Sequence, residues 1–178
     1  SVEAQTVRPD SMIIVDGSDD RANRQIVSDL DLSFECTYIF QDGDDGPSEA
    51  RNIGLEAAES DLVAFLDDDD RWSPGKLETQ LATYEETDVG LVFCGIKNVR
   101  PDGTVTNRTC PTTVPDEKSI LVTDTIGTPS TVLVRREIAE AVGGFDEELP
   151  VREDWEFYIR VLQVSEAAAI PELLVTKE

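Results

Sequence analysis

A short apolar segment that ends in four consecutive carboxylates most constrains how this chain can fold. Residues 62–66 read Leu-Val-Ala-Phe-Leu, and Asp67, Asp68, Asp69 and Asp70 follow directly. An apolar run of this length with polar flanks predicts a strand buried on both faces. In open α/β sheets, ligands bind just beyond the carboxyl ends of such strands. The four acids favour a hard divalent cation as counter-charge, although a solvated acidic loop explains the same residues.

The segments around this strand alternate between strand and helix patterns. Strands are predicted at 12–15, 34–40 and 62–66, with helices at 22–30 and 47–58 between them. Such alternation predicts an α/β fold with a mostly parallel central sheet flanked by helices. The second half is more mixed: we expect helices at 73–86, 136–142 and 153–164, and strands at 90–99, 104–109, 131–134, 167–170 and 173–176.

The composition excludes several classes of protein. With 38 acidic and 15 basic residues, the net charge of −23 argues against nucleic acid or an anionic membrane surface as the main partner. The chain contains no histidine, which excludes Ser-His-Asp and Cys-His catalysis and any metal site with a histidine ligand. An acidic composition with few lysines is typical of proteins from a high-salt cytoplasm, so we expect a halophilic source.

No run of the chain reaches the roughly 18 apolar residues that a membrane span needs. No signal peptide is recognisable either. We therefore expect no transmembrane segment in this chain, and a protein that is cytoplasmic or lies at the inner face of the membrane.

Three polar residues beside predicted elements are candidates for ligand binding. Asp16 ends the strand at 12–15, so its carboxylate and that of Asp67 should point into one crevice if the strands are parallel. Asp16 could accept hydrogen bonds from a ribose or a base, or form a turn with Gly17. Arg51 and Asn52 occupy the first turns of a helix, where Arg51 could bind a phosphate or pair with nearby acids.

Six motifs occur in an order that resembles the family 2 glycosyltransferases of the GT-A fold. They are DGSDD at 16–20, GPSEARNIGL at 46–55, FLDDDDRWSPGKL at 65–77, GTPSTVLVRR at 127–136, VGGFDEEL at 142–149 and REDWEFYIR at 152–160. The resemblance covers nearly the whole chain. It implies one GT-A domain over 1–178, with a nucleotide-binding half at 1–90 and an acceptor and catalytic half at 91–178.

The resemblance also implies a metal site and a nucleotide site. Asp67-x-Asp69 would hold Mn²⁺ or Mg²⁺ on the diphosphate of a nucleotide-sugar donor, with Asp69 as the closer ligand and Asp68 or Asp70 in support. Neutralising the diphosphate makes it a better leaving group, which is what a cation held by carboxylates supplies. In the same family pattern Asp16 would contact the base, and Arg51 and Asn52 would line the nucleotide pocket.

In the same resemblance, Asp154 matches the acidic residue of the family's E-D motif, which is the general base in inverting members. A carboxylate there can accept the proton of an acceptor hydroxyl as it attacks. Its position at a helix start is also favoured by the helix dipole alone. The expected activity is metal-assisted transfer of a sugar, with inversion, to a glycan or a lipid-linked acceptor.

One departure from the family pattern concerns the start of the chain. Family members usually begin with a central strand that nothing here matches, so we expect about 20–25 residues to be absent, going by strand and helix lengths. A non-catalytic protein of the same fold that binds a sugar nucleotide or a divalent cation therefore remains an alternative. A calcium loop at 42–53 is disfavoured, because Pro47 and Ile53 replace the glycine and glutamate that it needs.

The excess of acids predicts a dependence on salt. We expect the midpoint of thermal unfolding to rise steeply as KCl increases from dilute to molar, because salt screens the repulsion among 38 acids. Differential scanning calorimetry over a KCl series measures this directly. A flat response would show that the acidity is not an adaptation to high salt.

Overall fold

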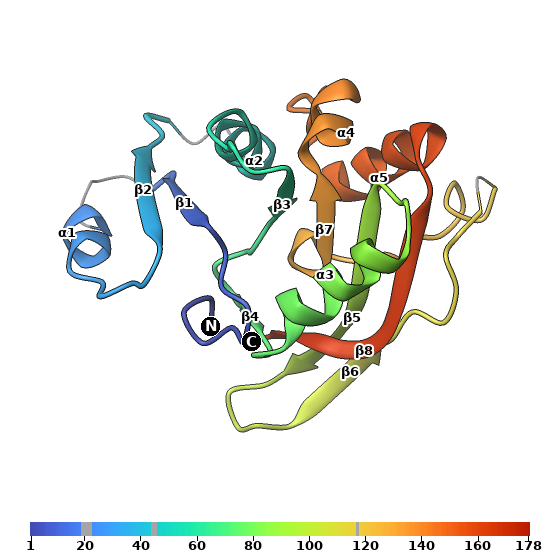
Figure 1. Cartoon of the computed structure of the whole chain (residues 1–178), viewed down its shortest axis with the longest axis horizontal. Coiled ribbons are helices and arrows are strands. Elements are labelled where there is room, and N and C mark those ends of the chain that lie inside the picture. Colours follow the sequence, from blue (N-terminus) through green and yellow to red (C-terminus); the bar gives the residue numbers. More distant parts are fainter. Residues whose placement is uncertain (19–22, 44–45, 117) are drawn as a thin grey trace.

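The computed structural model describes residues 1–18, 23–43, 46–116 and 118–178, and it contains a small and a larger β-sheet (Figure 1). The expected helix start at Ala22, the acids at 19–20 in the first motif and those at 44–45 in the loop before the next helix lie outside these residues. Within them, no helix is both long and apolar enough to span a membrane.

The small sheet is the strand–helix–strand unit that the sequence predicts. Strands β1 (Ser11–Asp16) and β2 (Glu35–Phe40) pair in parallel, with helix α1 (Asn23–Ser28) between them in the chain. Helix α2 (Gly46–Glu56) packs on β1, where Gly54 lies close enough that an added Cβ would contact Val15. The parallel pairing follows because a helical crossover returns the chain to the same end of the sheet.

The larger sheet has the strand order β3-β7-β5-β8-β4, with β6 paired to β5. Its strands are β3 (Leu62–Ala64), β4 (Asp70–Trp72), β5 (Leu91–Val99), β6 (Val105–Thr109), β7 (Val132–Arg135) and β8 (Ala167–Lys177). Only β5 and β8 pair in parallel, and the other four pairings are antiparallel.

This arrangement corrects the expectation of one mostly parallel central sheet. The α/β class holds, but β3 pairs with β7 in antiparallel fashion and has no pairing with β1 among the described residues. Apolar runs identify strands and carry no information about their direction, which depends on the neighbour that each strand meets. Strand β3 is also shorter than expected and only half-buried, with the buried Phe65 just beyond it.

Strand β5 is the centre of the hydrophobic core, because both of its faces are covered. Leu91 and Phe93 face a cluster that includes Phe157 of helix α5 (Glu153–Val164), beside helix α4 (Arg136–Ala141). Val92 and Cys94 face the opposite cluster, which includes Leu77 of helix α3 (Lys76–Glu86). The alternation follows from the two-residue period of a strand. Helices α5 and α3 therefore cover opposite faces of the sheet (Figure 1).

Lys76 at the start of α3 is fully buried, which gives the fold a pH dependence. Its Nζ donates to Gln80 Oε1 at 2.6 Å and lies 4.1 Å from the centre of the Trp72 ring. Burial lowers the pKa of Lys76 from 10.5 to about 8. Between these values the unfolded chain keeps a proton on Lys76 that the folded chain has released, so stability should increase with pH.

We expect the unfolding free energy of the wild type, relative to Lys76→Met, to rise by up to about 3 kcal/mol between pH 8 and pH 10.5. Urea unfolding of both proteins across this range measures the difference. The methionine variant is the control for other groups that titrate at high pH. Parallel pH profiles would contradict a buried, proton-releasing Lys76.

Candidate active site

The acids that follow β3 converge on one point. Asp67, Asp69 and Asp70 each place a carboxylate oxygen within 4.8 Å of the others, and we call these three residues the acidic cluster. Asp70 already belongs to β4, so its position is set by pairing with Lys177 of β8. Asp68 is exposed and is not part of the cluster. The predicted pair Asp67 and Asp69 is thus brought together, with Asp70 as the third member.

Asp70 is the member of the acidic cluster whose carboxylate is buried and unsatisfied. The residue is 5% exposed, and within the described parts of the chain neither carboxylate oxygen has a hydrogen-bond partner. Burial raises the pKa of Asp70, and the charges of Asp67 and Asp69 add to this effect, whereas Ser130 and Lys177 oppose it. A buried carboxylate without a partner is costly, and a hard divalent cation with oxygen ligands would satisfy it. The acidic cluster therefore fits Mg²⁺ or Mn²⁺.

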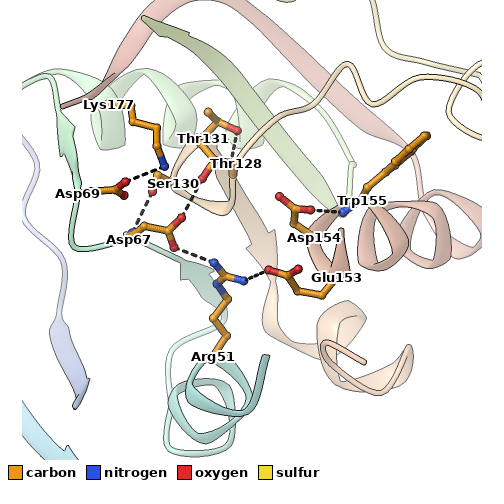
Figure 2. A network of polar contacts seen from close by, with 10 residues as sticks. All are labelled: Arg51, Asp67, Asp69, Thr128, Ser130, Thr131, Glu153, Asp154, Trp155 and Lys177. Atoms are coloured by element: carbon orange, nitrogen blue, oxygen red, sulfur yellow. Dashed lines mark hydrogen bonds and ion pairs between the residues drawn. The ribbon is translucent and has the colours of Figure 1, made fainter. Parts of the chain in front are cut away.

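Two basic side chains already partly neutralise the acidic cluster (Figure 2). Arg51 of α2 lies between Asp67 Oδ1, at 2.9 Å, and Glu153 Oε1 of α5, at 2.8 Å. Lys177 Nζ pairs with Asp69 Oδ2 at 2.8 Å. Burial alone would lower the pKa of Arg51, but the charges and hydrogen bonds of Asp67 and Glu153 outweigh it, so the pKa is raised.

The segment before β7 holds Asp67 in place. Thr128 Oγ1 donates to Asp67 Oδ2 at 2.9 Å, and the Asp67 backbone N–H donates to Ser130 Oγ at 3.0 Å. The Ser130 carbonyl in turn accepts from Trp72 Nε1 at 2.9 Å, in the short 3₁₀ turn η1 (Pro129–Thr131). Sequence reasoning did not identify Thr128 and Ser130 as site residues. Their signal was the group of hydroxyl residues at 128–131, in the part of the motif that precedes β7.

Asp154 lies in the first turn of α5, directly after Glu153. Its Oδ1 accepts from the Trp155 backbone N–H at 2.7 Å. Burial raises the pKa of Asp154, and the nearby charges of Glu153 and Asp124 add to the effect. Asp154 lines a cleft of about 300 Å³ together with Val122, Thr123, Asp124, Arg152 and Trp155. A carboxylate with a raised pKa beside a cleft has the properties of a general base.

The residue that precedes α5 has a strained backbone. Arg152 has φ 63°, the left-handed region, and is the only non-glycine residue with positive φ in the described parts of the chain. Its guanidinium lies 5.0 Å from the centre of the Trp155 ring, and Trp155 Nε1 donates to the Ile120 carbonyl at 2.6 Å. Such strain costs about 1–3 kcal/mol and is common at functional sites. It turns the chain sharply into α5, next to Asp154.

Asp16 has a different set of partners from the acidic cluster. It accepts from the Tyr38 hydroxyl at 2.6 Å, from the Ser18 backbone N–H at 3.0 Å and from Asn23 Nδ2 at 3.4 Å. The Tyr38 hydrogen bond is the main cause that lowers the pKa of Asp16. Asp16 belongs to the small sheet, and no hydrogen bond or ion pair joins it to the acidic cluster among the described residues. The expected shared crevice is therefore not supported by a contact.

Asn52 has a structural role that the sequence did not indicate. Its Nδ2 donates to the Phe145 carbonyl and its Oδ1 accepts from the Phe145 N–H, both at 2.8 Å. The neighbouring Gly144 has φ 69°, and an added Cβ there would lie 2.4 Å from Asn52 Oδ1. The amide of Asn52 thus fastens α2 to the loop after α4. Its main contacts are with the protein backbone, whereas the resemblance implied a nucleotide pocket.

Comparisons with known proteins show the family of this chain. The family model described as Glycosyl transferase family 2 matches residues 1–143. An uncharacterised glycosyltransferase of Haemophilus influenzae is 30% identical over 167 residues, which cover 92% of this chain and 55% of that protein. The chain therefore spans about half the length of this relative.

Solved structures show the same fold. TarS 1-349 of S. aureus superposes with a TM-score of 0.78 at 22% identity, covering 98% of this chain and 53% of that one. The same fragment in complex with UDP-GlcNAc gives a TM-score of 0.75 at 19% identity, over 99% of this chain and 52% of that one. From the family match, the ordered motifs and this GT-A-like fold, the chain belongs to glycosyltransferase family 2.

Proposed function

We propose that this protein transfers a sugar from a nucleotide-diphosphate donor to an acceptor hydroxyl, with inversion and with the help of Mn²⁺ or Mg²⁺. The observation that carries the proposal is the acidic cluster, in which buried Asp70 forms no hydrogen bond with the described residues. Membership of the family supports sugar transfer. The complex of the TarS fragment with UDP-GlcNAc supports a nucleotide sugar as the donor.

On the donor side, Asp67, Asp69 and Asp70 would hold the cation, which when bound neutralises the leaving diphosphate. Arg51 stays paired with Asp67 and Glu153, so we assign it the role of fixing the site. Asn52 holds the loop after α4, and Asp68 is exposed beside the acidic cluster. We retain Asp16 as the base contact, because its carboxylate is ionised and held rigidly by Tyr38.

On the acceptor side, Asp154 would accept the proton of the attacking hydroxyl. Its raised pKa makes it a better proton acceptor than an ordinary carboxylate, and its cleft offers room for the acceptor. Residues 1–90 would supply most of the donor side and 91–178 the acceptor side. We propose a glycan or a lipid-linked glycan as the acceptor, and a protein that works at high salt, which its acidic composition supports.

A non-catalytic protein of the same fold that binds a sugar nucleotide or a divalent cation is the second candidate. It would bind its ligand at the same acidic cluster and would not need Asp154 as a base. Release of sugar or nucleotide from UDP-GlcNAc in the presence of Mn²⁺ separates the two candidates, because only the enzyme turns the donor over. Binding without turnover, with a range of acceptors present, would favour the second candidate.

The first prediction for this site concerns the metal ligands. Asp70→Asn and Asp69→Asn should each weaken Mn²⁺-dependent binding of UDP by more than tenfold, or about 1.4 kcal/mol, because each removes a charged ligand. Asp68→Asn is the matched control, since it changes the same charge one residue away and outside the cluster. Titration calorimetry measures all three. A larger effect of Asp68→Asn than of Asp70→Asn would contradict the metal site described here.

The second prediction concerns the base. Asp154→Asn keeps the shape of the side chain and removes the proton acceptor, so transfer should fall by about 10²–10⁴-fold while UDP and Mn²⁺ binding stay near normal. Glu153→Gln is the control, because its amide oxygen can still accept from Arg51. Initial rates of transfer test both variants. If Glu153→Gln abolished transfer and Asp154→Asn did not, Glu153 would be the base.

A further inference from the structure

Lys177 lies directly on the acidic cluster, although it is more than 100 residues away in the sequence. In the pairing of β4 with β8, it is the partner of Asp70. Its Nζ reaches Asp69 Oδ2 at 2.8 Å, and the next residue, Glu178, donates its N–H to the Asp69 carbonyl at 3.0 Å. Figure 2 shows the ammonium group beside the Asp69 carboxylate, at the end of the cluster away from Arg51.

The two cations of the cluster are held very differently. The Arg51 side chain is 14% exposed and pairs with two carboxylates, one on each side. The Lys177 side chain is 42% exposed and pairs with one carboxylate, that of Asp69, which is itself 45% exposed. An exposed ion pair of one lysine contributes little and breaks easily, whereas a guanidinium held at both ends stays in place. Lys177 is therefore the cation that can leave the cluster.

Asp69 cannot serve Lys177 and a divalent cation equally well. The cluster has three carboxylates within 4.8 Å, and the buried Asp70 oxygens form no hydrogen bond with any residue that the structure describes. Lys177 occupies one oxygen of Asp69 and places its positive charge beside the cluster, so it would repel a divalent cation bound there. Once displaced, the ammonium group would remain next to the proposed diphosphate site. Phosphate oxygens form strong charge-assisted hydrogen bonds with lysine.

We propose that Lys177 is an internal counter-ion that exchanges Asp69 for a phosphate oxygen of the nucleotide when a divalent cation occupies the acidic cluster. This role rests on the proposed function, because it needs a nucleoside diphosphate at the cluster. It makes Lys177 a competitor of the metal when the nucleotide is absent and a ligand of the nucleotide when both are present. Removing the Lys177 charge should therefore strengthen the binding of the metal alone and weaken the binding of the nucleotide.

Calorimetry on Lys177→Met tests both signs with the whole chain. For Mn²⁺ alone, the variant should bind about two- to fivefold more tightly than the wild type, because an exposed ion pair no longer competes. For UDP with saturating Mn²⁺, the variant should bind about tenfold more weakly, since one hydrogen bond between charged groups is lost. Lys177→Arg should restore most of the UDP affinity.

Lys118→Met is the matched control, because it removes the same charge from an exposed lysine. It lies in the loop between β6 and η1, where it is exposed and forms no ion pair with the acidic cluster among the described residues. Both of its affinities should equal those of the wild type. Thermal unfolding of each variant verifies that it is folded, and Lys177→Gln replaces Lys177→Met if the methionine variant unfolds early.

Each remaining outcome overturns a stated part. Unchanged or weaker binding of Mn²⁺ alone by Lys177→Met would refute the competition, and unchanged UDP binding would refute the exchange to phosphate. Equal changes of both affinities in Lys118→Met would show that the effects come from the net charge of the protein and not from the position of Lys177. A wild type that binds Mn²⁺ and UDP while Lys177→Met behaves identically would overturn this inference alone. A wild type that binds neither would overturn the proposed function as well.

Discussion

Mutual repulsion among three carboxylates within 4.8 Å is the constraint on which the site depends. Like charges so close are tolerated only with positive partners or hydrogen-bond donors nearby. Asp67 forms an ion pair with Arg51 and accepts a hydrogen bond from the Thr128 hydroxyl, and Asp69 forms an ion pair with Lys177. These partners come from α2, from the loop before β7 and from β8, so most of the fold is needed to hold the acids together.

The same electrostatic arrangement connects the two sides of the site. Arg51 spans Asp67 and Glu153, and Glu153 is next to Asp154 at the start of α5. The helix has no side-chain hydrogen bond at its N-cap, where Arg152 is strained. Its first turn is instead held by the ion pair with Arg51. The partly buried guanidinium of Arg51 thus connects the acidic cluster to the start of α5, beside Asp154.

Local patterns in the sequence predicted several elements well. Helix α5 occupies the residues expected for it, because its apolar residues recur at helical spacing and pack on the core. The parallel pairing of β1 and β2 was also predictable, since a single helix joins them. The four acids at 67–70 were singled out because they directly follow an apolar strand, where ligands bind in α/β folds, and the pair Asp67 and Asp69 because it matches the family's D-x-D pattern. Each of these signals lies within a short stretch of chain.

The amino-acid sequence by itself determined the α/β class, the order of the motifs and the carboxylate chemistry of the site. Only the tertiary structure decided which acid completes the cluster, because the pairing of β4 with β8 buries Asp70 and leaves Asp68 in solvent. It also decided the antiparallel pairing of β3 and the placement of Lys177 on Asp69. Contacts between residues more than 100 positions apart depend on how strands are ordered in the sheet, and no local periodicity encodes that order.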